Sequence, residues 1–99
     1  MPAYVIVSYD VVDPEAFEAY VPGVLPILMK YQTEILVAGP AARSLEGQSR
    51  QVNVVLKFPS EAALNAFYDD PEYQPLKALR IRTTANCTLV AAKAFTPPA

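Results

Sequence analysis

The hydrophobic positions of this chain fall into short runs that predict strands and into helically spaced stripes between them. Residues 4–11 combine β-branched and aromatic side chains in a nearly continuous run, which is typical of a buried strand. Residues 51–58 alternate instead, with apolar side chains on one face and mostly polar side chains on the other. Two further runs complete the set, so the predicted strands are residues 4–11, 34–38, 51–58 and 87–94.

The first helical region begins at residues 13–15 (Asp-Pro-Glu), which supply an N-cap oxygen, a first-turn proline and an acid near the positive end of the helix dipole. An apolar stripe with steps of three and four follows, made of Phe17, Tyr20, Val21, Val24, Leu28 and Tyr31. Pro22 and Pro26 lie within this stripe, and each removes a backbone donor and crowds the preceding turn. We therefore expect a kink or a break near residues 21–25 that interrupts the helix without ending it.

A second helical region follows the third predicted strand. Ser60 is the expected N-cap, and Leu64 and Phe67 belong to the apolar stripe. Asp70 and Pro71 then have the pattern of a fresh N-cap and first helical position, which predicts a short extra helix before the last strand.

The resulting order is strand, helix, strand, strand, helix, strand, which matches the α+β ferredoxin-like fold. In this fold a four-stranded antiparallel sheet carries its helices on one face only. We expect one such domain over residues 1–96 and a short C-terminal tail at residues 97–99.

The other face of the predicted sheet has no helices left to cover it. Its side chains are partly apolar and partly polar: Ile6, Ser8, Asp10, Asn53, Val55 and Lys57, with Leu36 or Ala38 beside them. In addition, 53% of the residues are hydrophobic and only 18% are charged, which is a large apolar share for so short a chain. Both observations predict a homodimer that forms through the open sheet face.

The net charge and the lengths of the apolar segments argue against nucleic acid and membranes as partners. The formal net charge of −2 provides no basic surface for nucleic acid and no polybasic patch for a membrane. No run approaches the roughly 20 apolar residues of a membrane span, and the first residues lack the features of a signal peptide. Since the single cysteine, Cys87, cannot form an internal disulfide, we expect a cytoplasmic protein.

The chain contains no histidine, so the commonest general base and the commonest metal ligand are both missing. The acids gather at predicted helix starts without a recurring ligand spacing, and no glycine-rich loop could cradle a phosphate. We therefore predict no metal site and no tightly bound cofactor.

The candidate chemistry lies first in residues 69–80, where Tyr73, Gln74 and Arg80 are not accounted for by helix capping. In the functional interpretation, Arg80 holds a carboxylate or enolate oxygen in a cleft and Tyr73 donates beside it. In the structural interpretation, Arg80 neutralises the last turn of its helix or pairs with Glu72 or Asp70.

A second candidate group lies on the open sheet face and consists of Ser8, Asp10 and Asn53. If this face lines a cavity, Asp10 is the best available general base, because burial would raise its pKa. Alternatively, Asp10 lies at the solvated end of its strand or pairs with Lys57 across the sheet.

Two further residues have a functional and a structural interpretation. Tyr20 belongs to the first helical stripe, where a tyrosine is usually part of the core, but the nearby prolines could open a ligand cleft beside it. Cys87 has no second cysteine to support catalysis, so we expect a small buried hydrophobe rather than a nucleophile.

The chain resembles a bacterial family, the domain-of-unknown-function 1330 family of the dimeric α/β-barrel superfamily. The resemblance covers nearly the whole chain and rests on residues 2–6, the helix start at 13–15 followed by Tyr20, the Lys30-Tyr31 pair and, above all, the run from 71 to 80 (PEYQPLKALR). One departure is the Gln-Thr-Glu at 32–34, where the family usually has glycines. The resemblance implies a homodimer whose two sheets form a barrel-like assembly with a cleft in each protomer.

Two hypotheses follow for function. The first is a cofactor-independent enzyme that acts on a small organic acid or enolisable substrate, with Arg80 holding the anion and Asp10 or Tyr73 transferring a proton; Ser8, Tyr20, Asn53 and Gln74 would then contact the ligand. The second is a non-catalytic dimeric module that binds or senses a small molecule in the same cleft.

Overall fold

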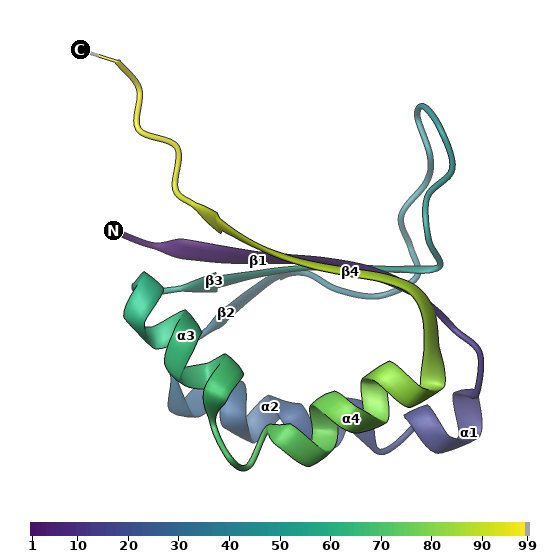
Figure 1. The fold of residues 1–99 in the computed structure, drawn as a ribbon. Helices are drawn as coiled ribbons and strands as arrows, with labels where there is room; N and C mark the ends of the chain where they lie inside the picture. Colours follow the sequence, from purple (N-terminus) through teal and green to yellow (C-terminus); the bar gives the residue numbers. More distant parts are fainter. Residues whose placement is uncertain (99) are drawn as a thin grey trace.

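A computed structural model describes residues 1–98; Ala99, the last residue of the predicted tail, lies outside the described residues. The elements follow one another along the chain (Figure 1) as β1 (Ala3–Val11), α1 (Pro14–Phe17), α2 (Tyr20–Lys30), β2 (Glu34–Val37), β3 (Val52–Phe58), α3 (Glu61–Asp69), α4 (Gln74–Thr83) and β4 (Thr84–Lys93). This is the predicted ferredoxin-like α+β fold.

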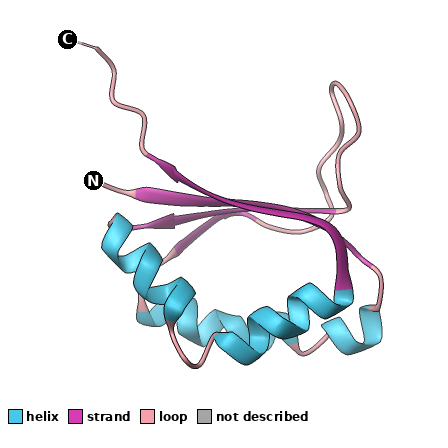
Figure 2. Cartoon of the chain, viewed as in Figure 1, coloured by secondary structure: helices cyan, strands magenta, loops and turns pink. Residues whose placement is uncertain are grey.

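The strands form one antiparallel sheet in the order β2-β3-β1-β4, and the helices lie together on one of its faces (Figure 2). In β1, Ala3, Val5, Val7 and Tyr9 are buried against the helices, because alternate side chains of a strand point to the same face. Leu56 and Phe58 of β3, paired with Val5 and Ala3, extend the same core. The alternation seen in the sequence therefore selects the buried face of the sheet.

The first helical region is interrupted, but at a different place from the one predicted. The break lies at residues 18–19 between α1 and α2, and α2 continues through residues 21–25. Pro22 lies in the first turn of α2, where a backbone N–H would have no intrahelical acceptor, so it does not break the helix. The expectation of a break near residues 21–25 was therefore wrong, while a kink there stays a prediction.

The close approach of α2 to α4 explains the small residue at position 23. A Cβ atom added to Gly23 would lie 2.6 Å from Cδ2 of Leu76 in α4. A larger residue at this position would push the two helices apart or displace the Leu76 side chain.

The corner between α3 and α4 also differs from the prediction. Asp70 ends α3 instead of starting the next helix, and its carboxylate accepts a hydrogen bond from the Glu72 backbone N–H at 2.8 Å. This hydrogen bond stabilises the turn at residues 70–73. Helix α4 begins only at Gln74, with Pro75 in its first turn. From there α4 passes directly into β4, which begins three residues earlier than expected.

The face of the sheet away from the helices remains uncovered within residues 1–98. Ile6, Val37 and Val90 are about half exposed there, at 48%, 48% and 51%. The segment between β2 and β3 and the C-terminal tail both rise from the sheet on this side (Figure 1). Within residues 1–98, no helix is long and apolar enough to cross a membrane.

Candidate functional site: a cavity between the helices and the sheet

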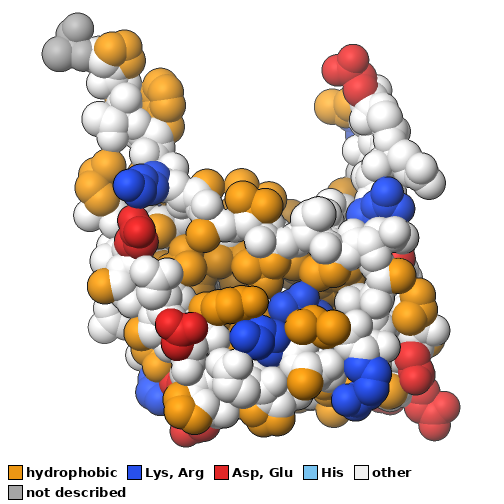
Figure 3. Space-filling view, viewed as in Figure 1, with side chains coloured by type: hydrophobic (Ala, Val, Ile, Leu, Met, Phe, Trp, Pro, Cys, Tyr) orange, Lys and Arg blue, Asp and Glu red, His pale blue; other side chains and the backbone are white. Residues whose placement is uncertain are grey.

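A cavity of about 110 Å³ lies between the helices and the covered face of the sheet. Its walls are mainly aliphatic and aromatic side chains from β1, β3, α2 and α3; they include Val5, Val7, Val24, Leu28, Leu56 and Phe67. Hydrophobic side chains, coloured orange, are prominent between the sheet and the helices in the space-filling view (Figure 3). Among the residues of 1–98 that line this cavity, Arg80 is the one that carries a charge.

Arg80 lies in the last turn of α4 and is only 4% exposed. Its Nη1 donates to Sγ of Cys87 at 3.0 Å, while its Nε has no hydrogen-bond partner within residues 1–98. The predicted alternative, a pair with Asp70, does not form, because Asp70 binds Lys30 Nζ at 2.8 Å. Nor does any other carboxylate of the described chain lie within ion-pair distance of Arg80.

An arginine is always protonated in a protein, so this guanidinium is a buried cation without a counter-ion in the described chain. Burial of an unpaired charge is costly and is rarely retained for stability alone. The unpartnered Nε also leaves part of the planar fork unused. A bound oxygen anion would supply the missing counter-charge and could accept a hydrogen bond from the free Nε.

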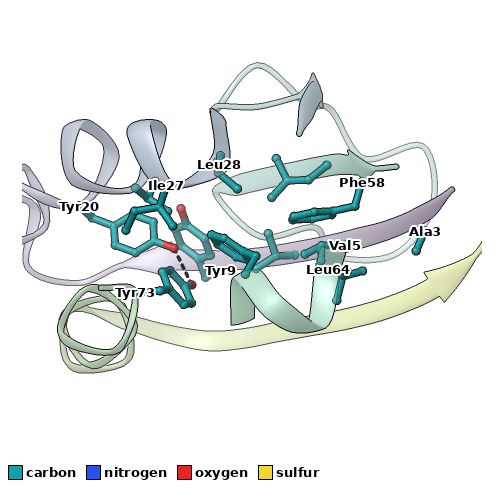
Figure 4. Packing of buried hydrophobic residues seen from close by; sticks show 13 residues of the cluster. Ala3, Val5, Tyr9, Tyr20, Ile27, Leu28, Phe58, Leu64 and Tyr73 are labelled. Atoms are coloured by element: carbon teal, nitrogen blue, oxygen red, sulfur yellow. Dashed lines mark hydrogen bonds between the residues drawn. The ribbon is translucent and has the colours of Figure 1, made fainter. Parts of the chain in front are cut away.

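Tyrosines surround the charged end of the cavity. The hydroxyl groups of Tyr20 and Tyr73 are hydrogen-bonded to each other at 2.9 Å, shown as a dashed line in Figure 4. Burial raises the pKa of the Tyr20 phenol, and the neighbouring Tyr73 adds to the rise. Burial also raises the pKa of Tyr9, and the Arg80 cation opposes part of that rise. The phenols of Tyr9 and Tyr20 are therefore neutral at physiological pH.

Tyr9 was not singled out in the sequence, although it also lines the cavity. Its neighbours Ser8 and Asp10 are polar and share the opposite face of the sheet. The period-two alternation of β1 already places Tyr9 with Val5 and Val7 on the helix face, and this is the signal that could have identified it.

Ser8, Asp10 and Asn53 belong to the opposite side of the sheet and are not among the residues that line the cavity. The hydroxyl groups of Ser8 and Thr88 lie 3.2 Å apart, and Asn53 Nδ2 donates to the Arg50 carbonyl at 3.2 Å. The structure thus separates Ser8, Asp10 and Asn53 from the cavity. Their roles in catalysis and ligand binding stay predictions, and they concern the open face alone.

Asp10 lies near the end of β1 and accepts several hydrogen bonds. The donors are Asn86 Nδ2 at 3.0 Å, the Gln51 backbone N–H at 2.8 Å and Arg50 Nη1 at 3.4 Å. The bond from Asn86, followed by the bond from Gln51, lowers the pKa of Asp10. The predicted alternative of a pair with Lys57 does not form. Asp10 is a hydrogen-bonded carboxylate that ties β1 to its neighbours.

Gln74 begins α4, and its side chain closes the preceding corner. Its Nε2 donates to the carbonyl groups of Tyr68 at 2.9 Å and Asp70 at 3.0 Å. These bonds satisfy carbonyl groups at the end of α3, so the residue has a sufficient structural explanation.

The cavity as a whole combines one fixed cation, phenolic donors and an apolar interior. No group of three or more His, Cys, Asp or Glu side chains in residues 1–98 could hold a metal ion. The geometry suits a small organic anion with an apolar body, whose charged end meets Arg80 and whose remainder contacts the aliphatic walls.

Comparison with solved structures identifies relatives of the same fold. A protein of unknown function from Rhodopseudomonas palustris is similar with a TM-score of 0.79 and 18% identity, over 97% of this chain and 84% of that one. A dimeric ferredoxin-like protein of unknown function from Jannaschia sp. CCS1 has a TM-score of 0.70 and 19% identity, over 95% and 100%. SnoaB, a cofactor-independent oxygenase from Streptomyces nogalater, has a TM-score of 0.65 and 11% identity, over 97% and 95%.

No curated protein matches the chain. At identities of 11–19%, the similarity to the solved structures establishes the fold and nothing finer. The family model described as "Domain of unknown function (DUF1330)" matches residues 2–95. The chain therefore belongs to the DUF1330 family.

Proposed function

We propose that this protein is a homodimer that binds a small organic anion in the cavity of each protomer and acts on it as a cofactor-independent enzyme. The observation that carries the proposal is Arg80, a 4% exposed guanidinium without a counter-ion in residues 1–98, at the wall of an otherwise apolar cavity. The ligand would supply the missing negative charge, and its apolar part would replace water in the cavity.

In this proposal Arg80 holds the carboxylate or enolate oxygen, and Tyr73 handles a proton. The Tyr73 hydroxyl is bonded to that of Tyr20 at 2.9 Å, so a proton donated to the ligand can be replaced through Tyr20. A fixed cation and a phenol beside the same oxygen would stabilise a ligand that binds as an enolate, and protonation of that enolate by Tyr73 would give the carbonyl compound without a separate base. The likeness to a cofactor-independent oxygenase supports an enzyme on this fold.

The dimer would form through the open sheet face. Ile6, Val55 and Val90 are neighbours across β3, β1 and β4, and they form the apolar centre of that face. Several solved structures of the same fold are described as dimeric. Because the cavity lies on the helix side, this association leaves the ligand site of each protomer complete.

A non-catalytic binding or sensing module is the second candidate, and one observation favours it. Within residues 1–98, the cavity wall contains no carboxylate, and burial raises the pKa of the phenols at Tyr9 and Tyr20. A strong general base is therefore not built into this wall. Under this alternative the bound acid would be released unchanged.

The test is calorimetric titration with matched pairs of ligands, each a small aliphatic or aromatic monocarboxylate and its neutral amide. We expect the acid to bind wild type and the amide to bind at least tenfold more weakly, since a charge-assisted bond contributes roughly 1.5–3 kcal/mol. In Arg80→Met the preference for the acid should vanish. Equal binding of acid and amide by wild type would refute the anion site.

Turnover separates the two candidates. Acids that bind are incubated with protein in deuterated buffer with oxygen, and deuterium incorporation, oxygen uptake and product are measured. Exchange or product that depends on Tyr73, and is lost in Tyr73→Phe, supports the enzyme. Recovery of every bound acid unchanged supports the binding module.

A further inference from the structure

The contact between Arg80 and Cys87 is not used by the proposed reaction. Arg80 Nη1 donates to Cys87 Sγ at 3.0 Å. Cys87 is partly buried, packs against the edge of the core and is a free thiol. It lies on the helix side of the sheet, away from the proposed dimer face.

A local irregularity of the sheet places Cys87 in this position. The register of the β1–β4 pair shifts between Ser8 and Asp10, and Asn86 adopts the left-handed conformation with φ of 57°. This is the pattern of a β-bulge, which reorients the side chains beside it. Asparagine is one of the few residues that adopts this backbone at small cost, and its side chain is further fixed by Asp10.

The Arg80 guanidinium next to the sulfur favours reaction of the Cys87 thiol with anionic reagents. A cysteine reacts as an anion, and reactive cysteines lie in positively charged, partly exposed surroundings. Arg80 provides that charge, and its unpartnered Nε shows that no other group in residues 1–98 has saturated the guanidinium. The same charge attracts an anionic reagent to the sulfur.

We propose that Cys87 is a modification site for small electrophilic organic acids, with Arg80 as its positioning residue, and that a negatively charged adduct on Cys87 becomes the counter-ion of Arg80 and closes the anion site. The first part depends on the contact between Arg80 and Cys87 alone. The second part rests on the proposed function, because it requires that Arg80 binds an organic anion.

The chemistry needs no co-reactant. With a haloacid, a bond forms between Sγ and the halogen-bearing carbon, the halide leaves and the thiol proton passes to solvent. With an α,β-unsaturated acid, Sγ bonds to the β-carbon, the π bond breaks and the α-carbon takes a proton. In both products a carboxylate is tethered within reach of the Arg80 fork.

Alkylation rates test the first part, with iodoacetate and iodoacetamide as the charged and neutral probes. Because Cys87 is the chain's only cysteine, intact mass reports its modification directly. The ratio of the iodoacetate rate to the iodoacetamide rate is measured in the folded protein and in urea, where the chain is unfolded. We expect the ratio to be higher in the folded protein by roughly fivefold or more, the effect of one nearby unit charge.

Arg80→Met should lower the folded ratio to the value in urea. A wild-type ratio equal in both states would overturn the site, and this comparison stands even if Arg80→Met fails to fold. A folded Arg80→Met that retains the higher ratio would equally overturn the role of Arg80.

The two adducts provide a matched pair for the second part, since they differ in charge and hardly in size. Carboxymethylated wild type should lose binding of organic acids, whereas carbamidomethylated wild type should retain it. Equal binding by both adducts would overturn closure by charge. If unmodified protein binds no acid, the proposed function and closure both fail, while the alkylation ratio still decides the modification site.

Discussion

At the scale of the residue, the cavity brings together side chains that stand far apart in the chain. The residues of 69–80 that helix capping did not explain were Tyr73, Gln74 and Arg80, and two of them line the cavity. Gln74 has its own structural explanation in the carbonyl groups it binds. That Tyr20 would meet Tyr73 could not be predicted, because the contact depends on how α2 packs against the turn that precedes α4.

The hydroxyl pair of Tyr20 and Tyr73 can be tested by a double-mutant cycle. Removing either hydroxyl leaves a buried partner unsatisfied, so each single change to Phe should lower the free energy of unfolding by about 1 kcal/mol. Tyr20→Phe/Tyr73→Phe should lose less than the sum, since neither unpaired group remains. Denaturant unfolding of the wild type, the two single variants and the double variant measures these free energies. Tyr68→Phe is the control, because its hydroxyl makes no hydrogen bond within residues 1–98, and additive losses would contradict the pair.

At the scale of the element, the sequence predicted strands better than helix boundaries. Alternation and β-branched content depend on local pattern, and β1, β2 and β3 lie within one residue of their predicted limits. Helix breaks depend on tertiary contacts as well as on proline. The chain passes from α1 to α2 before Pro22, and α4 begins after a turn made by Asp70. Both boundaries therefore depend on more than the local signal of a proline or an acid.

Asp70 joins the end of α2 to the corner between α3 and α4. Its carboxylate accepts hydrogen bonds from Lys30 Nζ, Tyr31 Oη and the Glu72 backbone N–H. The bond from Lys30, with those from Tyr31 and Glu72, lowers the pKa of Asp70 to about 2. This clamp fixes helices on both sides of the cavity.

The clamp predicts a specific response to acid. Since the folded pKa lies below the unfolded value, the stabilisation is present above about pH 4 and is lost as the pH falls towards 2. Asp70→Asn should lack this part of the pH dependence and be less stable than wild type at pH 7. Urea unfolding between pH 2 and 7 measures it. The neighbouring exposed Asp69→Asn should keep the wild-type slope, and a wild-type slope in Asp70→Asn would contradict the clamp.

At the scale of the whole molecule, the fold was predicted from the order of the elements, and the position of the site was only partly predicted. Sequence periodicity distinguishes the two faces of a sheet but does not show which face borders a cavity. The polar candidates Asp10 and Asn53 lie on the open face, whereas the cavity lies beneath the helices around Arg80. Cavities arise from imperfect filling between elements, and that depends on three-dimensional packing.

Two variants test the proposed dimer, one with a carboxylate added to the open sheet face and one with a carboxylate added to the helix side. Ile6→Glu places a carboxylate at the centre of the open sheet face, where burial against a second copy would leave it unpaired. We expect wild type to sediment as a dimer at micromolar concentration and Ile6→Glu to sediment as a monomer. Met29→Glu, which adds the same charge at a 75% exposed site on α2, should remain dimeric. Dissociation of both variants, or of neither, would contradict the sheet interface.

The central claim is that Arg80 serves to bind an anion and contributes little to folding. The most direct measurement is the free energy of unfolding of wild type and Arg80→Met, each without ligand and with a hundredfold excess over the wild-type Kd of an acid that binds. Without ligand, Arg80→Met should be as stable as wild type or more stable by ~1 kcal/mol, because a buried unpaired charge is replaced by an apolar chain. With ligand, wild type alone should gain about 2.7 kcal/mol. A variant that is much less stable without ligand, or one that gains as much from the acid as wild type, would contradict the account.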